Sequence, residues 1–244
     1  MPALALAHVE QMVKDGADII DVGGESTRPG AVSVSEQDEV ERVAPLVEAI
    51  RERFDVPISV DTSKPAVMRA AVAAGADMLN DVRALREQGA LEAVAELGVP
   101  VCLMHMQGKP RSMQCAPRYD DVTTDVLRFL SQRVNACQAA GIARDKLLVD
   151  PGFGFGKSLT HNFTLLKELN CFKSLGLPLL VGVSRKSMIG SILDKPVEQR
   201  LYGSIAAASL ALWQGANIIR VHDVAATRDV VKVCQAVMDV DSKD

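Results

Sequence analysis

The sequence lacks the residue patterns of several common protein classes. Its five cysteines are scattered without a C-x-x-C pair, and its four histidines do not have the spacing of a zinc site. An odd cysteine count without framework spacing indicates free thiols in a reducing compartment. The formal net charge is −4, and basic residues are mixed with acidic ones along the chain, so nucleic acid is not expected as a partner.

The N-terminus also lacks the basic region and apolar run of a signal peptide, and no apolar run approaches the length of a transmembrane helix. We therefore expect a cytoplasmic protein without a membrane partner. The composition, 48% apolar and 24% charged, is typical of a globular chain. No linker rich in serine, proline or glycine divides the sequence, so we expect one domain over residues 1–244.

A glycine-rich stretch follows a short apolar run and reads Asp150-Pro151-Gly152-Phe153-Gly154-Phe155-Gly156-Lys157. It is not a P-loop, because Pro151 stands where the first glycine belongs. It is not a dinucleotide fingerprint either, because Lys157 stands where the last glycine belongs. Glycine allows the backbone to approach a ligand closely, so the stretch predicts a ligand-covering loop beside a carboxylate. A plain glycine-rich turn is an equally good interpretation of this stretch alone.

Strands alternate with helices along the whole chain, which predicts a parallel sheet built from βαβ units. We expect strands at residues 17–22, 56–60, 77–80, 100–105, 146–150, 177–183 and 218–221. We expect helices at residues 3–15, 35–54, 65–75, 87–97, 121–140, 161–170, 198–214 and 225–239. Eight helices with seven strands fall one strand short of a TIM (β/α)8 barrel. The prediction is an α/β fold of this type, with the first β-strand missing from this chain.

Polar residues cluster at the carboxyl ends of the predicted strands, where TIM barrels carry their chemistry. The opposite junctions are dominated by glycine, proline and apolar residues. This asymmetry predicts a functional site at the carboxyl ends of the strands. The polar residues there are Glu25 to Arg28, Asp61, Asn80, His105, Asp150, Lys186, Arg220 and His222.

Two carboxylates and an amide would converge from three strand ends, namely Asp61, Asn80 and Asp150. Together they can accept hydrogen bonds from a flat, nitrogen-rich heterocycle. Asp61 has the alternative role of an N-cap for the helix that follows it. Lys186 next to Arg185 suggests an anionic or carbonyl-bearing ligand, although a solvated lysine is the usual alternative.

The last predicted strand carries a candidate phosphate site. Arg220 and His222 alternate with a valine, so they point the same way on a strand, and the pair suits a phosphate. A structural histidine is the alternative for His222. Thr27 and Arg28 lie on a loop that could swing over the site. Met104 fits a core position better, although it could pack against a ring.

Six segments of the chain form a recognisable set, namely Asp21-Val22-Gly23-Gly24-Glu25-Ser26-Thr27-Arg28-Pro29-Gly30, Ser59-Val60-Asp61-Thr62-Ser63-Lys64-Pro65, Asn80-Asp81, Asp150 to Lys157, Ser184-Arg185-Lys186-Ser187 and Arg220-Val221-His222-Asp223. Together they resemble the dihydropteroate synthase family, in the family's order, over nearly the whole chain, and most closely the enzymes of enteric-type bacteria. The resemblance implies a transferase of folate biosynthesis. Such an enzyme condenses 6-hydroxymethyl-7,8-dihydropterin diphosphate with 4-aminobenzoate to give 7,8-dihydropteroate and diphosphate. The resemblance also implies sulfonamides as inhibitors, Mg²⁺ as cofactor and a homodimer through the late helices.

The resemblance also implies roles for particular residues. The pterin would be held by Asp61, Asn80, Asp150 and Lys186, with Met104 against the ring. The diphosphate would be held by Arg220 and His222, with help from Thr27. The aminobenzoate pocket would be shaped by Arg28, Pro29, Phe155, Ser184 and Lys186. The family is thought to ionise the C–O bond first, so catalysis would rest on leaving-group stabilisation and positioning by Asp150, Lys186, Arg220 and His222.

The chain departs from the family at its start. The family begins with a strand that ends in Asn-x-Thr-Pro-Asp-Ser-Phe-Ser-Asp-Gly, whose Asn helps to bind magnesium, and this chain has no such segment. We therefore expect no metal ligand in this chain. We favour a misassigned start codon over a deliberate truncation or a natural form that closes differently. We also expect the chain as written to be poorly active or poorly soluble.

Two other functions stay open at this point. A pterin-binding methyltransferase would share the barrel and the Asp/Asn/Asp contacts, but it has no use for a diphosphate site, and Arg220-Val221-His222 argues against it. The chain could instead bind pterin without turnover. Diphosphate release that depends on 4-aminobenzoate distinguishes these functions.

Overall fold

The computed structural model describes residues 2–27, 30–108, 113 and 116–240. Its strands are β1 (Ile20–Gly23), β2 (Ile58–Asp61), β3 (Met78–Asp81), β4 (Val101–Met104), β5 (Leu147–Asp150), β6 (Leu180–Val181) and β7 (Ile218–Ile219). Its α-helices are α1 (Pro2–Lys14), α2 (Glu36–Arg51), α3 (Pro65–Ala73), α4 (Ala90–Leu97), α5 (Val122–Ala139), α6 (Leu159–Lys167), α7 (Ser187–Leu193), α8 (Leu201–Trp213) and α9 (Val224–Met238). Short 3-10 helices cover Arg144–Lys146, Leu169–Leu175 and Val197–Gln199.

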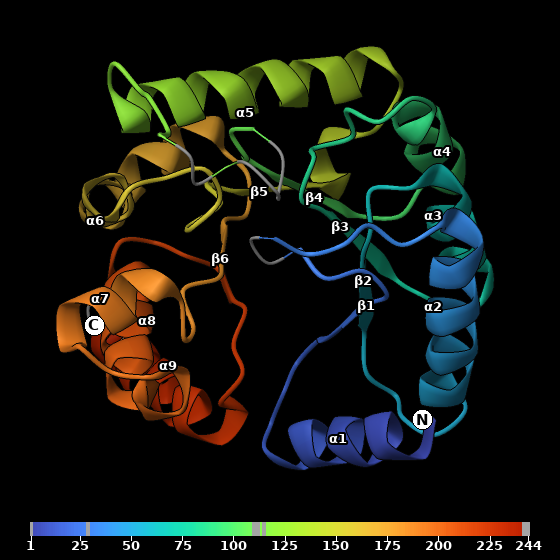
Figure 1. Ribbon diagram of the computed structural model, residues 1–244, viewed down its shortest axis with the longest axis horizontal. Helices are drawn as coiled ribbons and strands as arrows, with labels where there is room; N and C mark the ends of the chain where they lie inside the picture. The colour runs from blue at the N-terminus through green and yellow to red at the C-terminus, as the bar shows by residue number, and fades with distance from the viewer. Residues whose placement is uncertain (1, 28–29, 109–112, 114–115, 241–244) are drawn as a thin grey trace.

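The strands run parallel and lie side by side in chain order. β1 to β5 form one hydrogen-bonded sheet, β6 pairs with β7, and a single bridge from Val149 to Leu179 joins the two. The helices surround the strands on the outside (Figure 1). This is the TIM-barrel architecture expected from the sequence, with seven strands in the described residues. Within the described residues no backbone pairing joins β7 to β1, where an eighth strand would close the barrel.

Strands β3, β4 and β5 are buried on both faces, and alternate residues of a strand face opposite sides. Ile58 and Val60 of β2 belong to the large core cluster under the helices. Met78 of β3 belongs to a separate apolar cluster inside the barrel, with residues from β4, β5 and β6. Asp61 follows Val60 directly, and its register partner Asn80 lies two residues after Met78. Both polar side chains therefore belong to the interior layer, at the carboxyl ends of their strands.

Local sequence signals set several helix boundaries. The side chain of Ser35 begins α2 by accepting a hydrogen bond from the backbone N–H of Asp38. Three helices end in a left-handed glycine and turn directly into the next strand. The φ values are 92°, 107° and 102° at Gly16, Gly75 and Gly215.

Some of the predicted elements are wrong in detail. The sequence analysis predicts no helix at α7, because seven residues with Gly190 in the middle give no amphipathic repeat. The described chain thus has nine α-helices rather than eight. The strands predicted at 177–183 and 218–221 keep two paired residues each. Arg220 and His222 therefore lie beyond the end of β7, although the backbone N–H of Arg220 still donates to the carbonyl oxygen of Val181 at 2.9 Å.

Candidate functional site

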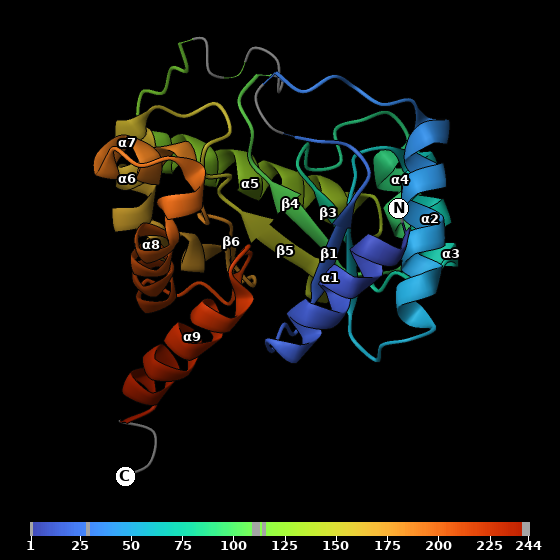
Figure 2. The same cartoon turned by 60° about the horizontal axis from the view of Figure 1, so that its bottom comes forward.

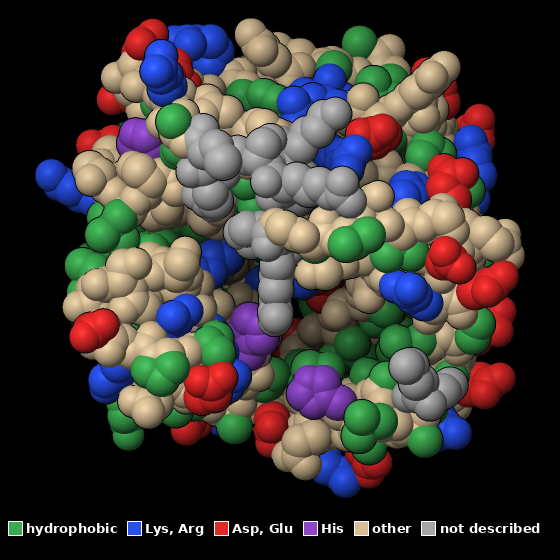
Figure 3. Space-filling model, viewed as in Figure 1, with side chains coloured by type: hydrophobic (Ala, Val, Ile, Leu, Met, Phe, Trp, Pro, Cys, Tyr) green, Lys and Arg blue, Asp and Glu red, His purple; other side chains and the backbone are tan. Residues whose placement is uncertain are grey.

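The segments that follow the strands gather at one end of the barrel (Figure 2). A space-filling view onto this end shows a hollow near its centre, with acidic, basic and histidine side chains around it (Figure 3). This is the end at which the sequence predicts the site.

The residues predicted to hold the pterin begin with neighbours on β2 and β3. Asp61 and Asn80 are register partners, and Asn80 is buried. Asp61 is not the N-cap of α3, because Lys64 occupies that position. Its alternative role as a cap is therefore wrong, and its carboxylate belongs to the interior of the barrel end.

Asp61 lies close to two other charged side chains. Nη2 of Arg220 is 3.7 Å from Oδ2 of Asp61, and Nε of Arg220 donates to Oδ2 of Asp21 at 2.7 Å. Burial first, and then the carboxylate of Asp21, raise the pKa of Asp61 to about 8, against the opposite effect of Arg220. A ligand that donates hydrogen bonds to Asp61 would therefore stabilise the ionised form of its carboxyl group.

Asp21 is not among the residues predicted from the sequence. Its Oδ1 is buried and has no hydrogen-bond partner among the described residues. A buried acceptor without a partner is costly, which marks Asp21 as part of the site. The signal that could have found it is a carboxylate between two buried apolar residues, Ile20 and Val22.

The raised pKa of Asp61 makes the stability of the protein depend on pH. The folded state keeps this proton up to about pH 8, whereas an unfolded aspartate loses it near pH 4. Between these values the folded state binds more protons, so the free energy of unfolding falls as the pH rises. An asparagine at this position cannot ionise. We therefore expect Asp61→Asn to raise Tm by roughly 5 °C more at pH 9 than at pH 5.

Thermal unfolding at the two pH values measures this difference. Asp55→Asn is the matched control, because Asp55 is exposed, and its effect on Tm should be the same at both pH values. An effect of Asp61→Asn that does not change with pH contradicts the burial of a protonated carboxyl group.

Asp150 ends β5 beside Met104 of β4, its register partner. Its Oδ1 accepts a hydrogen bond from the backbone N–H of Gly152 at 2.7 Å. Burial raises the pKa of Asp150, and the positive charge of Lys186 opposes this shift. Met104 is buried in a small apolar cluster against which the ring of Phe155 packs. The pterin residues and the aminobenzoate residues predicted from the sequence are therefore neighbours.

Lys186 joins these two groups of residues. Its Nζ donates to the backbone carbonyl of Phe153 and lies 4.8 Å from the ring centroid of Phe155. Burial lowers the pKa of Lys186 to about 8, while the carboxylate of Asp150 acts in the opposite direction. A cation over an aromatic face is favourable, so the ring and the ammonium group hold one another in place.

Arg185 does not share this position, which corrects the prediction that both cations of this loop face one ligand. Its backbone has a φ of 57°, in the left-handed region. Its guanidinium forms an ion pair with Asp223, with Nε donating to Oδ2 at 2.9 Å. Of the two cations, Lys186 is the one that reaches the site.

Arg220 and His222 have different partners. Arg220 is bound to Asp21, as described above, whereas Nδ1 of His222 lies 3.0 Å from Oγ of Ser184. The backbone N–H of His222 donates to the same Oγ at 3.2 Å. Ser184 thus links the loop after β6 to the segment after β7. Both Arg220 and His222 are exposed to solvent at the barrel end.

The loop after β1 is tied to the loop after β2 by a charged cluster. Lys64 forms ion pairs with Glu25 and with the buried Glu39. Beside them, Thr27 and Asp61 line the same cavity of about 120 Å³. Thr27 therefore lies near the predicted pterin and diphosphate residues. Arg28 and Pro29, predicted for the aminobenzoate pocket, lie outside the described residues.

The glycines of the stretch 150–157 are required by both conformation and space. Their φ values are 71°, 80° and 63° at Gly152, Gly154 and Gly156. A Cβ atom on Gly152 would lie 1.9 Å from the carbonyl oxygen of His105. A Cβ atom on Gly156 would lie 2.3 Å from the carbonyl oxygen of Gln107. The loop therefore packs directly on the segment that follows β4.

The two phenylalanines of this stretch have different environments. Phe153 is 0% exposed and belongs to the main core, whereas Phe155 is half-buried beside Lys186. Phe153 is therefore a core residue and not part of a surface that covers a ligand. Its burial fixes the middle of the loop to the body of the barrel.

The close approach of Gly152 to His105 gives a stability prediction. Gly152→Ala adds a left-handed penalty of about 1–2 kcal/mol and a backbone overlap of about 1–3 kcal/mol. We expect it to lower the free energy of unfolding by about 3 kcal/mol, measured by urea unfolding. Gly98→Ala is the matched control, since its φ is 64° and its Cβ would meet nothing within 4 Å. It should cost about 1 kcal/mol, and equal losses in the two variants contradict the overlap.

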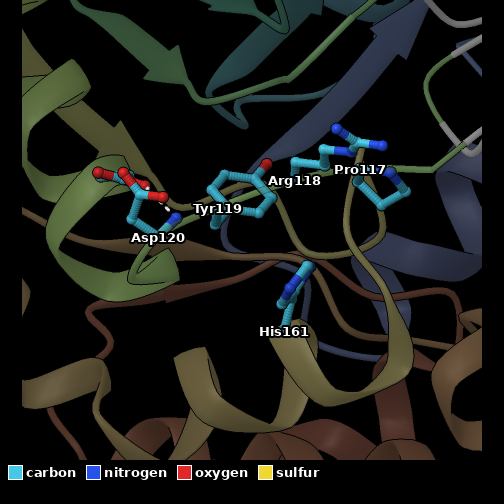
Figure 4. A pocket seen from close by; sticks show the side chains of 6 residues that line it. Pro117, Arg118, Tyr119, Asp120 and His161 are labelled. Carbon is cyan, nitrogen blue, oxygen red and sulfur yellow. Dashed lines mark hydrogen bonds between the residues drawn. The ribbon is translucent and has the colours of Figure 1, made fainter.

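A larger and more open cavity, of about 480 Å³, lies elsewhere. It is lined by Pro117, Arg118, Tyr119, Asp120, Asp125 and His161. Figure 4 shows His161 rising from α6 toward the ring of Tyr119. None of the residues predicted from the strand ends lines this cavity, so we do not assign the reaction to it.

The described residues contain no group of three or more His, Cys, Asp or Glu side chains that could hold a metal ion. In the same part of the chain, none of the helices combines the length and the apolar character needed to span a bilayer.

Comparison with known proteins identifies the family. Residues 2–222 match the family described as pterin binding enzyme. The dihydropteroate synthase of Haemophilus influenzae is 59% identical over 232 residues, which cover 95% of this chain and 84% of that protein. The structure of Yersinia pestis dihydropteroate synthase in a sulfonamide drug complex has a TM-score of 0.96 and 54% identity, covering 98% of this chain and 86% of that one.

A third relative, the Xanthomonas albilineans dihydropteroate synthase with 4-aminobenzoic acid, has a TM-score of 0.93 and 52% identity, again covering 98% of this chain and 86% of that one. These matches agree with the fold described above. The chain therefore belongs to the dihydropteroate synthase family of pterin-binding enzymes, which confirms the family, the fold and the transferase function expected from the sequence.

Proposed function

We propose that this chain condenses 6-hydroxymethyl-7,8-dihydropterin diphosphate with 4-aminobenzoate at the carboxyl end of the barrel. The observation that carries this proposal is the position of Lys186. It lies within the electrostatic influence of Asp150 on one side and over the ring of Phe155 on the other. One side chain thus borders both halves of the site, as a reaction between two substrates requires.

The pterin would lie against Asp61, Asn80 and Asp150. Burial raises the pKa of both carboxyl groups, so hydrogen bonds from ring N–H groups stabilise their ionised forms. Lys186 would donate to an acceptor of the ring, and Met104 would pack against its face. The register pairing of Asp61 with Asn80 supports this, since a flat ligand meets both residues at once.

The diphosphate would be bound by Arg220 and His222, with Thr27 nearby. A planar guanidinium matches two phosphate oxygens, and a histidine can donate to a third. Both side chains are exposed at the barrel end. The diphosphate would compete with Asp21 for the guanidinium of Arg220.

The aminobenzoate would lie beside Phe155, Ser184 and Lys186, and we place Arg28 and Pro29 at the same pocket. The relative solved with 4-aminobenzoic acid and the relative solved with a sulfonamide support these two kinds of ligand for the chain. We propose that sulfonamides inhibit this protein at the same place.

The chemistry needs stabilisation of a leaving group rather than a covalent nucleophile. The C–O bond of the hydroxymethyl group breaks, and its electron pair leaves with the diphosphate. The amine nitrogen then forms the new C–N bond and releases a proton. Arg220 and His222 would stabilise the negative charge that develops on the leaving oxygen, while the pterin residues hold the carbon in line.

We also propose Mg²⁺ as a cofactor. Magnesium is commonly held by one or two carboxylates together with substrate phosphates. The unpartnered Oδ1 of Asp21 fits this role. We therefore propose Asp21 as a ligand of the ion, in place of the expectation from sequence that this chain supplies none. When bound, the ion would neutralise part of the charge of the diphosphate.

We propose a cytoplasmic homodimer formed through α8 and α9. These helices pack on each other and expose large apolar side chains, including Leu210, Trp213 and Val233, at 56%, 64% and 65%. Apolar side chains gathered in this way mark an interaction surface, and a two-fold pair is the commonest closed assembly. Light scattering on the purified chain measures the assembly.

The function is tested by the release of diphosphate from the pterin substrate, measured with and without 4-aminobenzoate. We expect release that depends on both substrates. Pterin binding without release, measured by calorimetry, contradicts the proposal and identifies a binding protein.

A further inference from the structure

Side chains form hydrogen bonds with most of the backbone N–H and C=O groups of residues 152–156. A loop that covers a ligand by moving leaves many of its backbone groups to water, whereas here they have fixed partners. The bonds join Gly152 N–H to Asp150, Gly154 N–H to Asn162, Phe153 O to Lys186 and Gly156 O to Tyr119. The loop is therefore a fixed wall and not the mobile cover that its glycines predict.

Lys157 supplies two further bonds from beneath the loop. Its Nζ donates to the carbonyl oxygen of Gly152 at 2.8 Å and to that of Phe155 at 3.1 Å. Its third neighbour is Nδ1 of His105, at 2.9 Å. Lys157 is 3% exposed, so it is covered by protein and does not meet a substrate.

The partner of Lys157 is itself fixed. The ring of His105 meets the ring of Phe129 edge-on, with the centroids 4.9 Å apart. Tyr119, which binds Gly156, meets His161 in the same way, with the centroids 4.9 Å apart. Figure 4 shows these two side chains near each other. The bonds from Lys157 therefore connect the loop to α5 through His105, and the bond from Tyr119 connects it to α6.

A buried lysine loses its hydration, which lowers the pKa of Lys157 well below its usual value. An apolar side chain would avoid this cost, so the lysine is better explained by the geometry that it imposes. Lys157 binds the carbonyl oxygen of Phe155, and Nζ of Lys186 lies over the ring of the same residue. The geometry that Lys157 imposes therefore includes the position of Phe155.

We propose that Lys157 is a positioning residue for 4-aminobenzoate. By binding the carbonyls of Gly152 and Phe155, it fixes the ring of Phe155 as one wall of the pocket. This inference rests on the proposed function of Phe155. The pterin residues Asp61 and Asn80 stand on other strands, and Asp150 precedes the loop at the end of β5. The loss of Lys157 therefore acts more on the binding of the amine than on that of the pterin.

Steady-state kinetics of Lys157→Met tests the proposal, since methionine has a similar length and no donor. We expect the KM for 4-aminobenzoate to rise about tenfold and the KM for the pterin diphosphate to stay within about twofold. The inhibition constant of a sulfonamide should rise together with the KM for 4-aminobenzoate. Tyr119→Phe, which removes one hydroxyl group, is a milder second variant with an expected rise of about threefold in the amine KM. Lys167→Met, an exposed lysine on α6, is the matched control.

Hydrogen exchange of the amides at 152–156 gives a readout that does not need turnover. We expect faster exchange in Lys157→Met than in the unmodified chain, and no change in Lys167→Met. Equal changes in the two KM values, or unchanged exchange in the loop, overturn the role of Lys157. An unmodified chain without turnover overturns the proposed function instead, and the exchange experiment still decides whether Lys157 fixes the loop.

Discussion

Lys186→Met is expected to lower kcat/KM by about 10²–10³-fold, with losses for both substrates. The substitution removes the cation that opposes the raised pKa of the buried Asp150 and that lies over Phe155. Leaving a buried charge without its partner costs about 3–5 kcal/mol, and each 1.36 kcal/mol corresponds to a factor of ten in rate. Steady-state kinetics with each substrate varied in turn measures the loss.

The neighbouring residue provides the matched control for this experiment. Arg185→Met removes a cation from the same loop, but this cation is paired with Asp223. We expect it to lower Tm and to leave kcat/KM within about threefold. Similar losses of activity in the two variants would show that the loop as a whole, and not Lys186, supports the reaction.

The contrast between Arg185 and Lys186 shows where prediction from sequence stops. The sequence places both cations at the end of one strand, and their types suggest the same ligand. The outcome depends on a φ of 57° at Arg185 and on Asp223, which lies 38 residues further on. Neither the backbone conformation nor so distant a partner follows from local pattern.

The fold could be predicted more fully from sequence, because it depends on local signals that repeat along the chain. Apolar runs of four or five residues between glycine and proline junctions predict β2 to β5 nearly at their observed positions. The ends of β6 and β7 were not accessible, since the length of a strand depends on how many residues its neighbour can pair with. Helix α7 was missed because it is too short for its apolar residues to show a period.

Sequence predicts those site residues whose signal lies in their immediate sequence neighbours. Asp61, Asn80 and Asp150 follow strand runs, so their place at the carboxyl end needs no tertiary information. Asp21 and Lys157 become meaningful only through contacts across the chain, with Arg220 in one case and His105 in the other. Sequence alone left Lys157 as the last residue of a glycine motif, with no sign that it is buried.

Arg220→Met is the second substitution with a large expected effect, a loss of about 10²–10³-fold in kcat/KM. The guanidinium stands between Asp21 and Asp61 at the unpaired side of the barrel, 2.7 Å and 3.7 Å away. From this position it would bind the leaving diphosphate, and removing one such donor typically costs about 3–4 kcal/mol of transition-state stabilisation. Arg220→Lys keeps the charge without the planar fork, so we expect an intermediate loss of about tenfold.

Inhibition by inorganic diphosphate separates this role from a merely structural one. The inhibition constant should rise at least about tenfold in Arg220→Met, because the product loses the same contact as the transition state. Arg228→Met is the matched control, since Arg228 pairs with Asp18 across the same gap between β7 and β1 but away from the strand ends. We expect its kcat/KM and its diphosphate inhibition to stay within about twofold. If both arginine variants lose activity equally while diphosphate inhibition is unchanged, then Arg220 holds the two edges of the barrel together and does not bind the leaving group.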